Sequence, residues 1–447
     1  MRSWRTALCV VGLLGICIGA SWGHVHRYST LSPIDELQHL DYVIRIGHGH
    51  LVVMGDRFDQ ESLRLESCHR LDADFDAKVP DCVVGVGVVL DPTRFQEDGY
   101  NTAAIHPPTY YAIDNVVARL LDRVLPGDQD VLVAARLVSG LWLAAGIVLL
   151  WFLLRSVGAD RLLAFALAAA IAVSPTVLHA SATVTNDATS ILVGTAMVFS
   201  VLKWERRSLP LWVPAVIAAL AAATKVTNLL AVALVLVYLV VRVLIADPGT
   251  DTDVRRRLRR FTERDRRVSV GIAAIGGSAG VVALGWAAAS SLMGRLSSDQ
   301  IPMVQRFSVD RFPMNGFIDS WMQTISPLSG GYLAPFLRSD AYLLCTGVFA
   351  VGLLGAVVAA AIRSEAGSAA RALSISLLWT LVLAGPALVL FNYVVQGIYV
   401  VIPMRYGIAL VPAMAVAAVP VLERRVLRWA TVVLAAGCVM SVAWALL

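Results

Sequence analysis

The chain has 447 residues, 57% of them hydrophobic and 15% charged, and a mean hydropathy of +0.70. This composition excludes a soluble globular domain, which cannot bury so much apolar surface. The formal net charge of +5 lies in short stretches between apolar segments, which argues for a lipid bilayer and against a nucleic-acid partner.

Eleven apolar segments are candidates for membrane spans, since about 20 apolar residues cross a hydrocarbon core about 30 Å thick. Backbone polar groups cannot stay unpaired in lipid, so such spans are helices. We therefore expect an all-α polytopic membrane protein with about eleven transmembrane helices, near 6–23, 131–154, 162–180, 188–202, 211–224, 228–245, 268–293, 341–362, 373–391, 403–421 and 430–447.

Arginine-containing connections alternate along the chain with acidic or neutral ones, as the positive-inside rule requires. This alternation predicts a cytoplasmic N-terminus, a first anchor at 1–23 and a first extracytoplasmic loop at 24–130. A cleaved signal peptide is the alternative for 1–23, because "GAS" at 19–21 suits a peptidase.

The domain plan continues with spans two to seven at 131–293, an extracytoplasmic loop rich in proline and aromatic residues at 294–340, and spans eight to eleven at 341–447. A cytoplasmic loop at 246–267 contains eight arginines and two acids in its last thirteen residues, which indicates contact with anionic headgroups. Three lysines beside thirty-four arginines, with abundant alanine and valine, indicate a bacterium, and hence its inner membrane.

The first outer loop carries eighteen acids and most of the histidines. Its stretches "DELQHLDYVIRI" (35–46) and "NVVARLLDRVL" (115–125) have the periodicity of amphipathic helices, which we expect to lie on the membrane surface. Cys68 and Cys82 share this loop on the oxidising side, and we expect a disulfide between them.

Paired acids follow the first span in "SPIDELQHLDY" (32–42). At helical spacing, Asp35, Glu36 and His39 share roughly one face. A partly desolvated carboxylate suits a general base, and a carboxylate pair also suits a divalent cation. A solvated helix start is the alternative, because acids favour a first helical turn.

Two polar stretches lie on the same predicted side of the membrane. In "IHPPTYYAIDN" (105–115), His106 precedes a stiff Pro-Pro turn, and Tyr110 and Tyr111 supply amphipathic rings; a structural elbow is the alternative. In "TVTNDATS" (183–190), Asn186 and Asp187 are candidates for an acidic site or, equally, for a helix cap.

Cations at the outer ends of spans oppose the positive-inside bias and therefore need an anionic partner. Lys225 in "AATKVTNLL" and Arg405 beside Tyr406 in "PMRYG" are two such cations. Arginine matches phosphate oxygens bidentately, so a lipid-linked phosphate is one candidate partner, and lipid headgroups or an acid of the outer loop are the others. Together with the acids, these cations predict one site with a base above a phosphate clamp.

Taken in order, the early "DE", the "HPPxYY" element, the "ND" between spans, the "K-[VL]-T" start and the late "RYG" resemble the GT-C superfamily of integral-membrane glycosyltransferases. Within it the chain is most similar to an uncharacterised bacterial multi-span family with "PDExxH" and "HPPLYY" motifs, read here as "SPIDELQH" and "HPPTYY". The resemblance runs from about residue 30 to 415.

The resemblance implies a glycosyltransferase that uses a polyprenyl-phosphate sugar donor and a glycan, lipid or protein acceptor of the cell envelope. Asp35 would be the general base with Glu36 beside it, and inversion would accompany direct displacement at the anomeric carbon. Acceptor or groove positions would be His39, His106, Tyr110, Tyr111, Asn186 and Asp187, and donor-phosphate positions Lys225, Arg405 and Tyr406. The ligands of any divalent cation (Mg, Mn or Ca) would be Asp35, Glu36 and Asp187.

Two other classes of function compete with this hypothesis. A transporter or flippase of a lipid-linked sugar would place polar residues at the bilayer midplane, whereas the ionisable residues here cluster at one boundary. A non-catalytic subunit of an envelope complex would not need Asp35.

Overall fold

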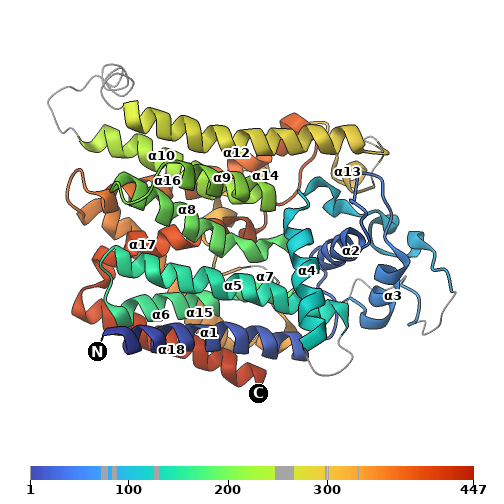
Figure 1. The fold of residues 1–447 in the computed structure, drawn as a ribbon, viewed down its shortest axis with the longest axis horizontal. Helices are drawn as coiled ribbons and strands as arrows, with labels where there is room; N and C mark the ends of the chain where they lie inside the picture. Colours follow the sequence, from blue (N-terminus) through green and yellow to red (C-terminus); the bar gives the residue numbers. More distant parts are fainter. Residues whose placement is uncertain are drawn as a thin grey trace.

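The computed structural model describes residues 2–71, 79–82, 88–124, 130–246, 266–296, 300, 302–330 and 332–447. Within these residues every named element is a helix. Figure 1 shows a bundle of long, nearly parallel helices with a smaller body of short helices and loops at one end. We call this smaller body (the described residues between 28 and 124) the lobe, the adjoining end of the bundle the lobe end, and the opposite end the far end.

The bundle confirms the expected all-α polytopic membrane architecture. Among the described residues, eight helices are long and apolar enough to cross a membrane, and a pair bent by 63° brings the number to nine. The helices of the bundle are α1 (Arg2–Arg27), α5 (Val131–Ser156), α6 (Arg161–Ala172), α7 (Pro175–Ala182), α8 (Ser190–Glu205), α9 (Trp212–Thr224), α10 (Leu229–Ala246), α12 (Arg266–Met293), α15 (Asp340–Arg363), α16 (Ala369–Gln396), α17 (Val411–Leu422) and α18 (Arg425–Leu446).

Helices occupy all eleven predicted segments, but they do not all have the length of a span. The bent pair is α6 and α7, which break at Ser174-Pro175 because proline cannot continue the preceding helix. Two others, α8 and α9, have 16 and 13 residues. Polar stretches interrupt the apolar sequence between α7 and α8 and between α9 and α10, and these two interruptions lie at the lobe end.

Side-chain caps fix where several spans begin. Asp130 accepts a hydrogen bond from the Leu132 amide at the start of α5, and Ser368 accepts one from the Arg371 amide at the start of α16. Such caps satisfy amide groups that have no partner within the helix. The predicted cytoplasmic loop at 246–267 falls almost entirely outside the described residues, which resume at Arg266.

The lobe has a hydrophobic core of its own. It is built from α2 (Glu36–Gly47), α3 (Gln60–His69), α4 (Thr109–Val124) and the short 3-10 helices η1 (Pro92–Arg94), η2 (Gln96–Gly99) and η3 (Thr102–Ile105). The first predicted amphipathic helix, α2, does not lie on a surface: residues from Glu36 to Ile44 are all buried. His39 and Asp41 find partners inside the lobe and Glu36 finds one on α5, so the surface prediction for this segment is wrong.

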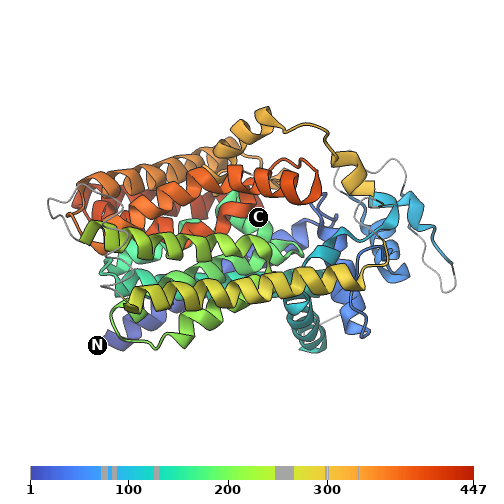
Figure 2. The same ribbon diagram turned by 90° about the horizontal axis from the view of Figure 1, so that it is seen from above.

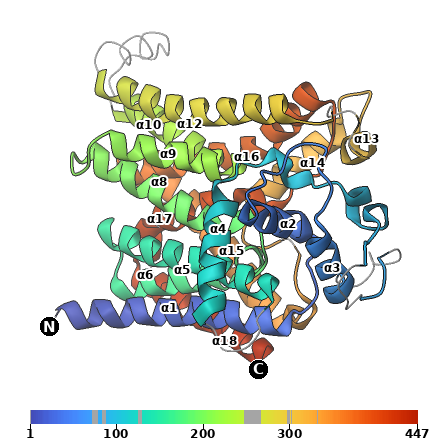
Figure 3. The same ribbon diagram turned by 45° about the vertical axis from the view of Figure 1, so that its right-hand side comes forward.

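The second predicted amphipathic helix, α4, crosses the lobe ends of the spans, as Figure 3 shows most clearly. It begins at Thr109, six residues before the predicted stretch. Val116, Leu120 and Val124 leave 59%, 54% and 74% of their surface exposed on one side of it. An exposed apolar stripe on a helix that runs across the spans suits the membrane boundary.

Covalent and polar links close the lobe. Cys68 and Cys82 form a disulfide across 14 residues of sequence. The next residue, His69, contacts Asp130 at the start of α5 with 2.5 Å between Nε2 and Oδ2. From above, α12 reaches beyond the other spans toward the lobe (Figure 2), where the Trp286 ring nitrogen donates to the Ile105 carbonyl at 2.9 Å.

The segment between α12 and α15 holds two short helices, α13 (Pro302–Phe307) and α14 (Met314–Ile325). Helix α14 packs along α16, and the Thr324 hydroxyl donates to the Leu381 carbonyl at 2.8 Å. Farther along this segment, Tyr332 receives a hydrogen bond from the Tyr28 hydroxyl at 3.2 Å, which brings the segment to the boundary between lobe and bundle.

A buried ion pair joins the lobe to the bundle. Glu36 at the start of α2 accepts two hydrogen bonds from Arg136 of α5, both at 2.8 Å, and the two side chains are 0% and 1% exposed. The backbone amides of Ser32 and Val184 also donate to Glu36. Arg136 in turn donates to the carbonyls of Tyr28 and Thr30. One buried pair therefore ties three chain segments together.

We predict that Arg136→Met destabilises the protein by about 3–5 kcal/mol, because it leaves the buried Glu36 carboxylate without its cation. Thermal unfolding of the detergent-solubilised protein would measure the loss. The double variant Arg136→Met/Glu36→Gln should recover part of it. Equal melting temperatures for wild type and Arg136→Met would show that the pair does not hold the lobe in place.

Candidate functional site

Four breaks between helices meet at the lobe end of the bundle. The first precedes α2, the second lies between α7 and α8 and contains η4 (Asn186–Thr189), and the third lies between α9 and α10 and contains η5 (Val226–Asn228). The fourth is η8 (Met404–Leu410), which leads into α17. Each break interrupts an apolar run with polar residues, so side chains far apart in sequence converge where the spans meet the lobe.

Charged side chains from all four breaks form one cluster. The Lys225 ammonium lies 2.5 Å from Oδ1 of Asp187. The Arg405 guanidinium lies 3.4 Å from Oδ2 of the same Asp187, through Nε, and 2.7 Å from Oδ2 of Asp35, through Nη2. Arg405 is therefore shared between two carboxylates, and the cluster pairs two cations with two anions.

Burial differs sharply between the two carboxylates. The Asp187 side chain is 1% exposed and Lys225 is 4% exposed, whereas Asp35 is 50% exposed and Arg405 16%. Burial alone would raise the pKa of Asp187, but the charges of Lys225 and Arg405 outweigh it and hold that pKa below its usual value. The buried pair of Asp187 and Lys225, which we call the inner pair, is thus a fixed part of the structure. Asp35 is the charged residue of the cluster that an incoming molecule can reach.

A network of polar side chains around Asn228 holds the inner pair in position. The Asn228 side chain accepts from the Ser190 hydroxyl at 2.8 Å and donates to Thr189 at 3.1 Å and Thr224 at 3.2 Å. Thr189 and Ser190 follow Asp187, and Thr224 precedes Lys225, so Asn228 connects the two breaks. Sequence reasoning missed Asn228; the signal was its place three residues after Lys225 in an otherwise apolar run.

A glycine allows the segment that carries Arg405 to lie deep in the bundle. A Cβ atom on Gly194, in the second turn of α8, would collide with the carbonyl oxygen of Ala409 in η8. Only a residue without a side chain lets the two backbones approach so closely. The position of η8 within the bundle, and therefore that of Arg405, depends on this contact.

The acidic motif does not present one face, as its spacing predicted. Asp35 precedes the helix and has left-handed backbone angles (φ 57°, ψ 12°), so the helix begins only at Glu36. Asp35 points to Arg405, Glu36 points to Arg136, and Nδ1 of His39 lies 2.7 Å from the Tyr111 hydroxyl. The left-handed residue at the turn is what separates the two acids.

The predicted groove residues form a buried layer beside the cluster. The His39 ring lies 5.5 Å from that of His106 and 5.8 Å from that of Tyr111. Burial lowers the pKa of His39 to about 3 and holds that of His106 well below its usual value, so both rings are neutral. Tyr110 is turned to Ser139 of α5, at 3.3 Å, and away from the charges.

Two further predicted residues, Asn186 and Tyr406, lie beside the inner pair. Asn186 is fully buried next to Asp187, and the cap of η4 is Thr185, whose hydroxyl accepts from the Asp187 amide. Tyr406 lies with its ring 5.4 Å from the Lys225 ammonium, a cation–π contact.

A small cavity of about 30 Å³ adjoins the cluster. Asp187 and Arg405 line one side of it, and Thr176, His179 and Tyr332 contribute polar atoms to the rest. Nε2 of His179 lies 3.1 Å from the Ser32 hydroxyl, and its ring lies 5.3 Å from that of Tyr332. His179 was not predicted from the sequence because it is the one titratable residue in the apolar segment "SPTVLHASA", so it forms no pattern with a neighbouring polar residue.

The carboxylates considered for a metal ion do not fit one in this arrangement. Glu36 is saturated by Arg136 and two backbone amides, and Asp35 and Asp187 are both paired with cations. Among the residues that the structure describes, no group of three or more His, Cys, Asp or Glu side chains could hold a metal ion.

Residues 106–250 match the family model described as dolichyl-phosphate-mannose-protein mannosyltransferase. That family belongs to the GT-C superfamily of membrane glycosyltransferases, which use lipid-linked sugars. The matched region includes Asp187 and Lys225 but neither Asp35 nor Arg405. No curated protein matches the chain.

We predict that acid destabilises the lobe through its buried neutral histidines. Unfolded histidine titrates near pH 6.5, whereas folded His39 titrates near 3. Between these values the unfolded state binds the additional proton, so stability falls as pH falls, by up to ~1.4 kcal/mol per pH unit for each such histidine.

The comparison of His39→Gln with wild type isolates this effect, because buried Asp41 and Asp114, whose pKa values burial raises, act in the opposite sense in both proteins. Melting temperatures between pH 7.5 and 5 should fall less steeply for His39→Gln than for wild type. The exposed His50→Gln variant is the control and should retain the wild-type slope. Identical slopes for all three proteins would contradict the burial of a neutral His39.

Proposed function

We propose that this protein is a membrane glycosyltransferase that moves a sugar from a polyprenyl phosphate to the hydroxyl of an acceptor. The observation that carries the proposal is the cluster of Asp35, Asp187, Lys225 and Arg405 at the lobe end of the spans. The match of residues 106–250 supports it, since the matched family acts on lipid-linked sugars. A phosphate at the membrane boundary and a sugar above it would suit this location.

The cations would hold the donor phosphate, and Asp35 would act on the acceptor. Lys225 and Arg405 are buried where the spans meet the lobe, and a phosphate there would be bound in a medium of low dielectric constant. Asp35, half exposed beside Arg405, would accept the proton of the acceptor hydroxyl. Attack on the anomeric carbon from the side opposite the phosphate would invert its configuration.

The reaction would balance charge within the site. The acceptor oxygen forms a bond to the anomeric carbon, the bond from that carbon to the phosphate oxygen breaks, and the proton of the hydroxyl moves to Asp35. One negative charge thereby disappears from Asp35 as one appears on the leaving phosphate. Arg405, already bound to the donor phosphate, would stabilise the charge that develops there, and such stabilisation is usually the largest contribution to catalysis.

The free enzyme would be in a closed resting state. The cavity of about 30 Å³ has room for only one or two water molecules, and Arg405 is bound to Asp35. A donor phosphate would compete with Asp35 for Arg405, and because Asp35 is the more exposed carboxylate it would be the one displaced. Donor binding would thereby release the base, so the donor would bind before the acceptor.

The other predicted residues would support this reaction indirectly. Glu36 would position Asp35 by fixing the start of α2 against Arg136. His39, His106 and Tyr111 would form the buried wall beneath the acceptor. The active site would face the outside of a bacterial inner membrane, with a component of the cell envelope as acceptor, in agreement with the distribution of arginine along the chain.

We predict that Asp35→Asn lowers kcat by about 10²–10⁴-fold, the usual size of general-base catalysis. The same variant removes the competitor for Arg405, so the Kd for a polyprenyl-phosphate sugar should stay equal or decrease. Transfer of radiolabelled sugar from candidate polyprenyl-phosphate donors and direct donor binding would measure the two effects. The exposed Asp310→Asn variant should behave as wild type.

Two results would reject this assignment. Wild-type turnover by Asp35→Asn would exclude Asp35 as the base. Donor binding and movement across proteoliposomes without any sugar transfer, by wild type with a range of acceptors, would favour a transporter of lipid-linked sugars.

We predict that Arg405→Gln weakens donor binding about 10-fold or more, because a hydrogen bond to a charged group is lost. Isothermal titration with a short-chain polyprenyl-phosphate sugar would measure the change, with the melting temperature as a check of folding. Lys225→Gln should weaken binding in the same way. If neither variant changes the donor Kd, the phosphate does not bind at this cluster.

A further inference from the structure

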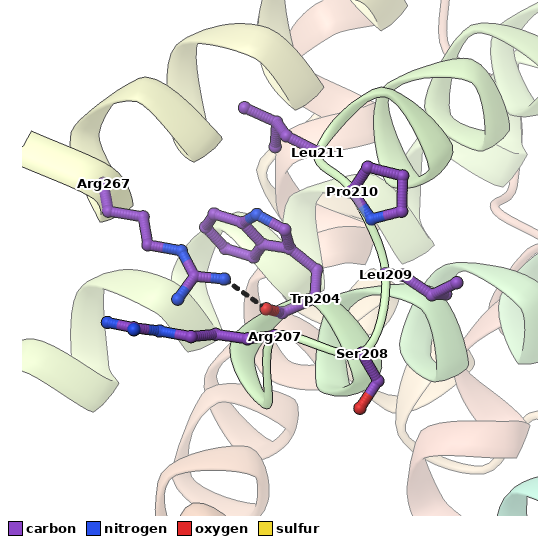
Figure 4. Close-up of a pocket in the computed structure, with 7 residues that line it drawn as sticks. All are labelled: Trp204, Arg207, Ser208, Leu209, Pro210, Leu211 and Arg267. Carbon is purple, nitrogen blue, oxygen red and sulfur yellow. Dashed lines mark hydrogen bonds between the residues drawn. The ribbon is translucent and has the colours of Figure 1, made fainter.

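A second group of cations lies at the far end of the bundle, outside the site described above. An open pocket of about 490 Å³ lies between the connection from α8 to α9 and the first turn of α12. Its lining is Trp204, Arg207, Ser208, Leu209, Pro210, Leu211 and Arg267. Figure 4 shows the guanidinium groups of Arg207 and Arg267 lying close together on one side of Trp204.

The backbone around the pocket holds these arginines in place. Arg207 has left-handed angles (φ 59°), and its amide donates to the Trp204 carbonyl at 2.9 Å. One guanidinium nitrogen of Arg267 donates to that carbonyl at 2.5 Å, and the guanidinium lies 5.0 Å from the centre of the Trp204 ring. A Cβ atom on Gly271 would meet the same ring, so α12 passes close against it.

The two guanidinium groups have no counter-charge within the described part of the chain. Glu205, the acid nearest to Arg207 along the sequence, accepts from Arg242 at 2.9 Å and from the Tyr238 hydroxyl at 2.5 Å. The acids nearest to Arg267, Glu263 and Asp265, lie outside the described residues. No described carboxylate pairs with Arg207 or Arg267. Two like charges held side by side repel each other, and an anion between them would remove that repulsion.

An apolar face leads from the pocket along the bundle. Trp212, Val216 and Leu220 of α9 follow one another at intervals of four residues and are 65%, 47% and 50% exposed. Four-residue spacing places them on one side of the helix. The helix begins beside the pocket, so a molecule with its charge at the arginines could lay a hydrocarbon chain along these three residues.

We propose that this pocket binds the headgroup of an anionic glycerophospholipid. The arginines would contact the phosphate, the Ser208 hydroxyl would donate to the headgroup, and an acyl chain would follow the exposed face of α9. Arginine with a neighbouring tryptophan at a membrane boundary suits such a ligand. The site lies at the opposite end of the spans from the Arg405 cluster and is independent of the proposed transferase reaction.

Binding of short-chain lipids to the full-length protein in a neutral detergent tests the proposal. Dihexanoylphosphatidylglycerol should bind, and dihexanoylphosphatidylcholine should bind far more weakly, as measured by native mass spectrometry and by the shift in melting temperature. Arg207→Gln/Arg267→Gln should weaken binding of the anionic lipid on the order of thirtyfold. Arg207→Lys/Arg267→Lys, which keeps the charge, should retain most of the affinity.

Arg363→Gln/Arg425→Gln is the matched control, because it removes two exposed arginines from the far end without touching the pocket. It should bind the anionic lipid as wild type does. Equal loss of affinity in both double variants would mean that net charge alone attracts the lipid, and the proposal would be wrong. Inorganic phosphate that protects as well as the lipid would likewise overturn the assignment to a phospholipid.

Discussion

Arg405 contacts two carboxylates at once, and the arrangement of the site depends on that contact. A charge at the edge of a bilayer is costly unless it is paired, so the four breaks that carry Asp35, Asp187, Lys225 and Arg405 have to meet. The interrupted helices α7, α8, α9 and α17 are a consequence: α7 and α9 end, and α8 and α17 begin, at breaks that carry residues of the cluster. The bundle is least regular where these charges are.

The lobe depends on a similar constraint at another pair. Glu36 and Arg136 are buried between lobe and bundle, and their hydrogen bonds account for every oxygen of the carboxylate. This saturation explains why two adjacent acids have different surroundings. Glu36 is committed to holding the two bodies together, whereas its neighbour Asp35 stays half exposed and free to exchange partners. An exposed carboxylate is thus positioned by a buried one of the same chemical type.

The sequence predicted the spans and the convergence of charges because both follow from local rules. Apolar length marks a span, and a cation at the end of a span that should be neutral requires an acid nearby, which linked Lys225 and Arg405 to the acidic motifs. The partner of Glu36 was not predictable, since Arg136 lies a hundred residues away inside a span. Nor was the left-handed angle of Asp35, which tertiary contacts impose and which overturned the shared helical face. His179 was missed because a single polar residue within an apolar run carries no pattern, whereas Asn228 follows Lys225 by three residues and could have been found there.

The close approach of α8 and η8 at Gly194 has a consequence for how this protein can vary. Gly194 touches no charged group, yet a single added methyl would push the Ala409 backbone outward and carry Arg405 with it. The hydrogen bond of 2.7 Å between Arg405 and Asp35 tolerates only a small change in the distance between the two side chains. The volume of one residue in the second turn of α8 therefore limits where Arg405 can lie, and alanine, which most helices accept, would not fit here.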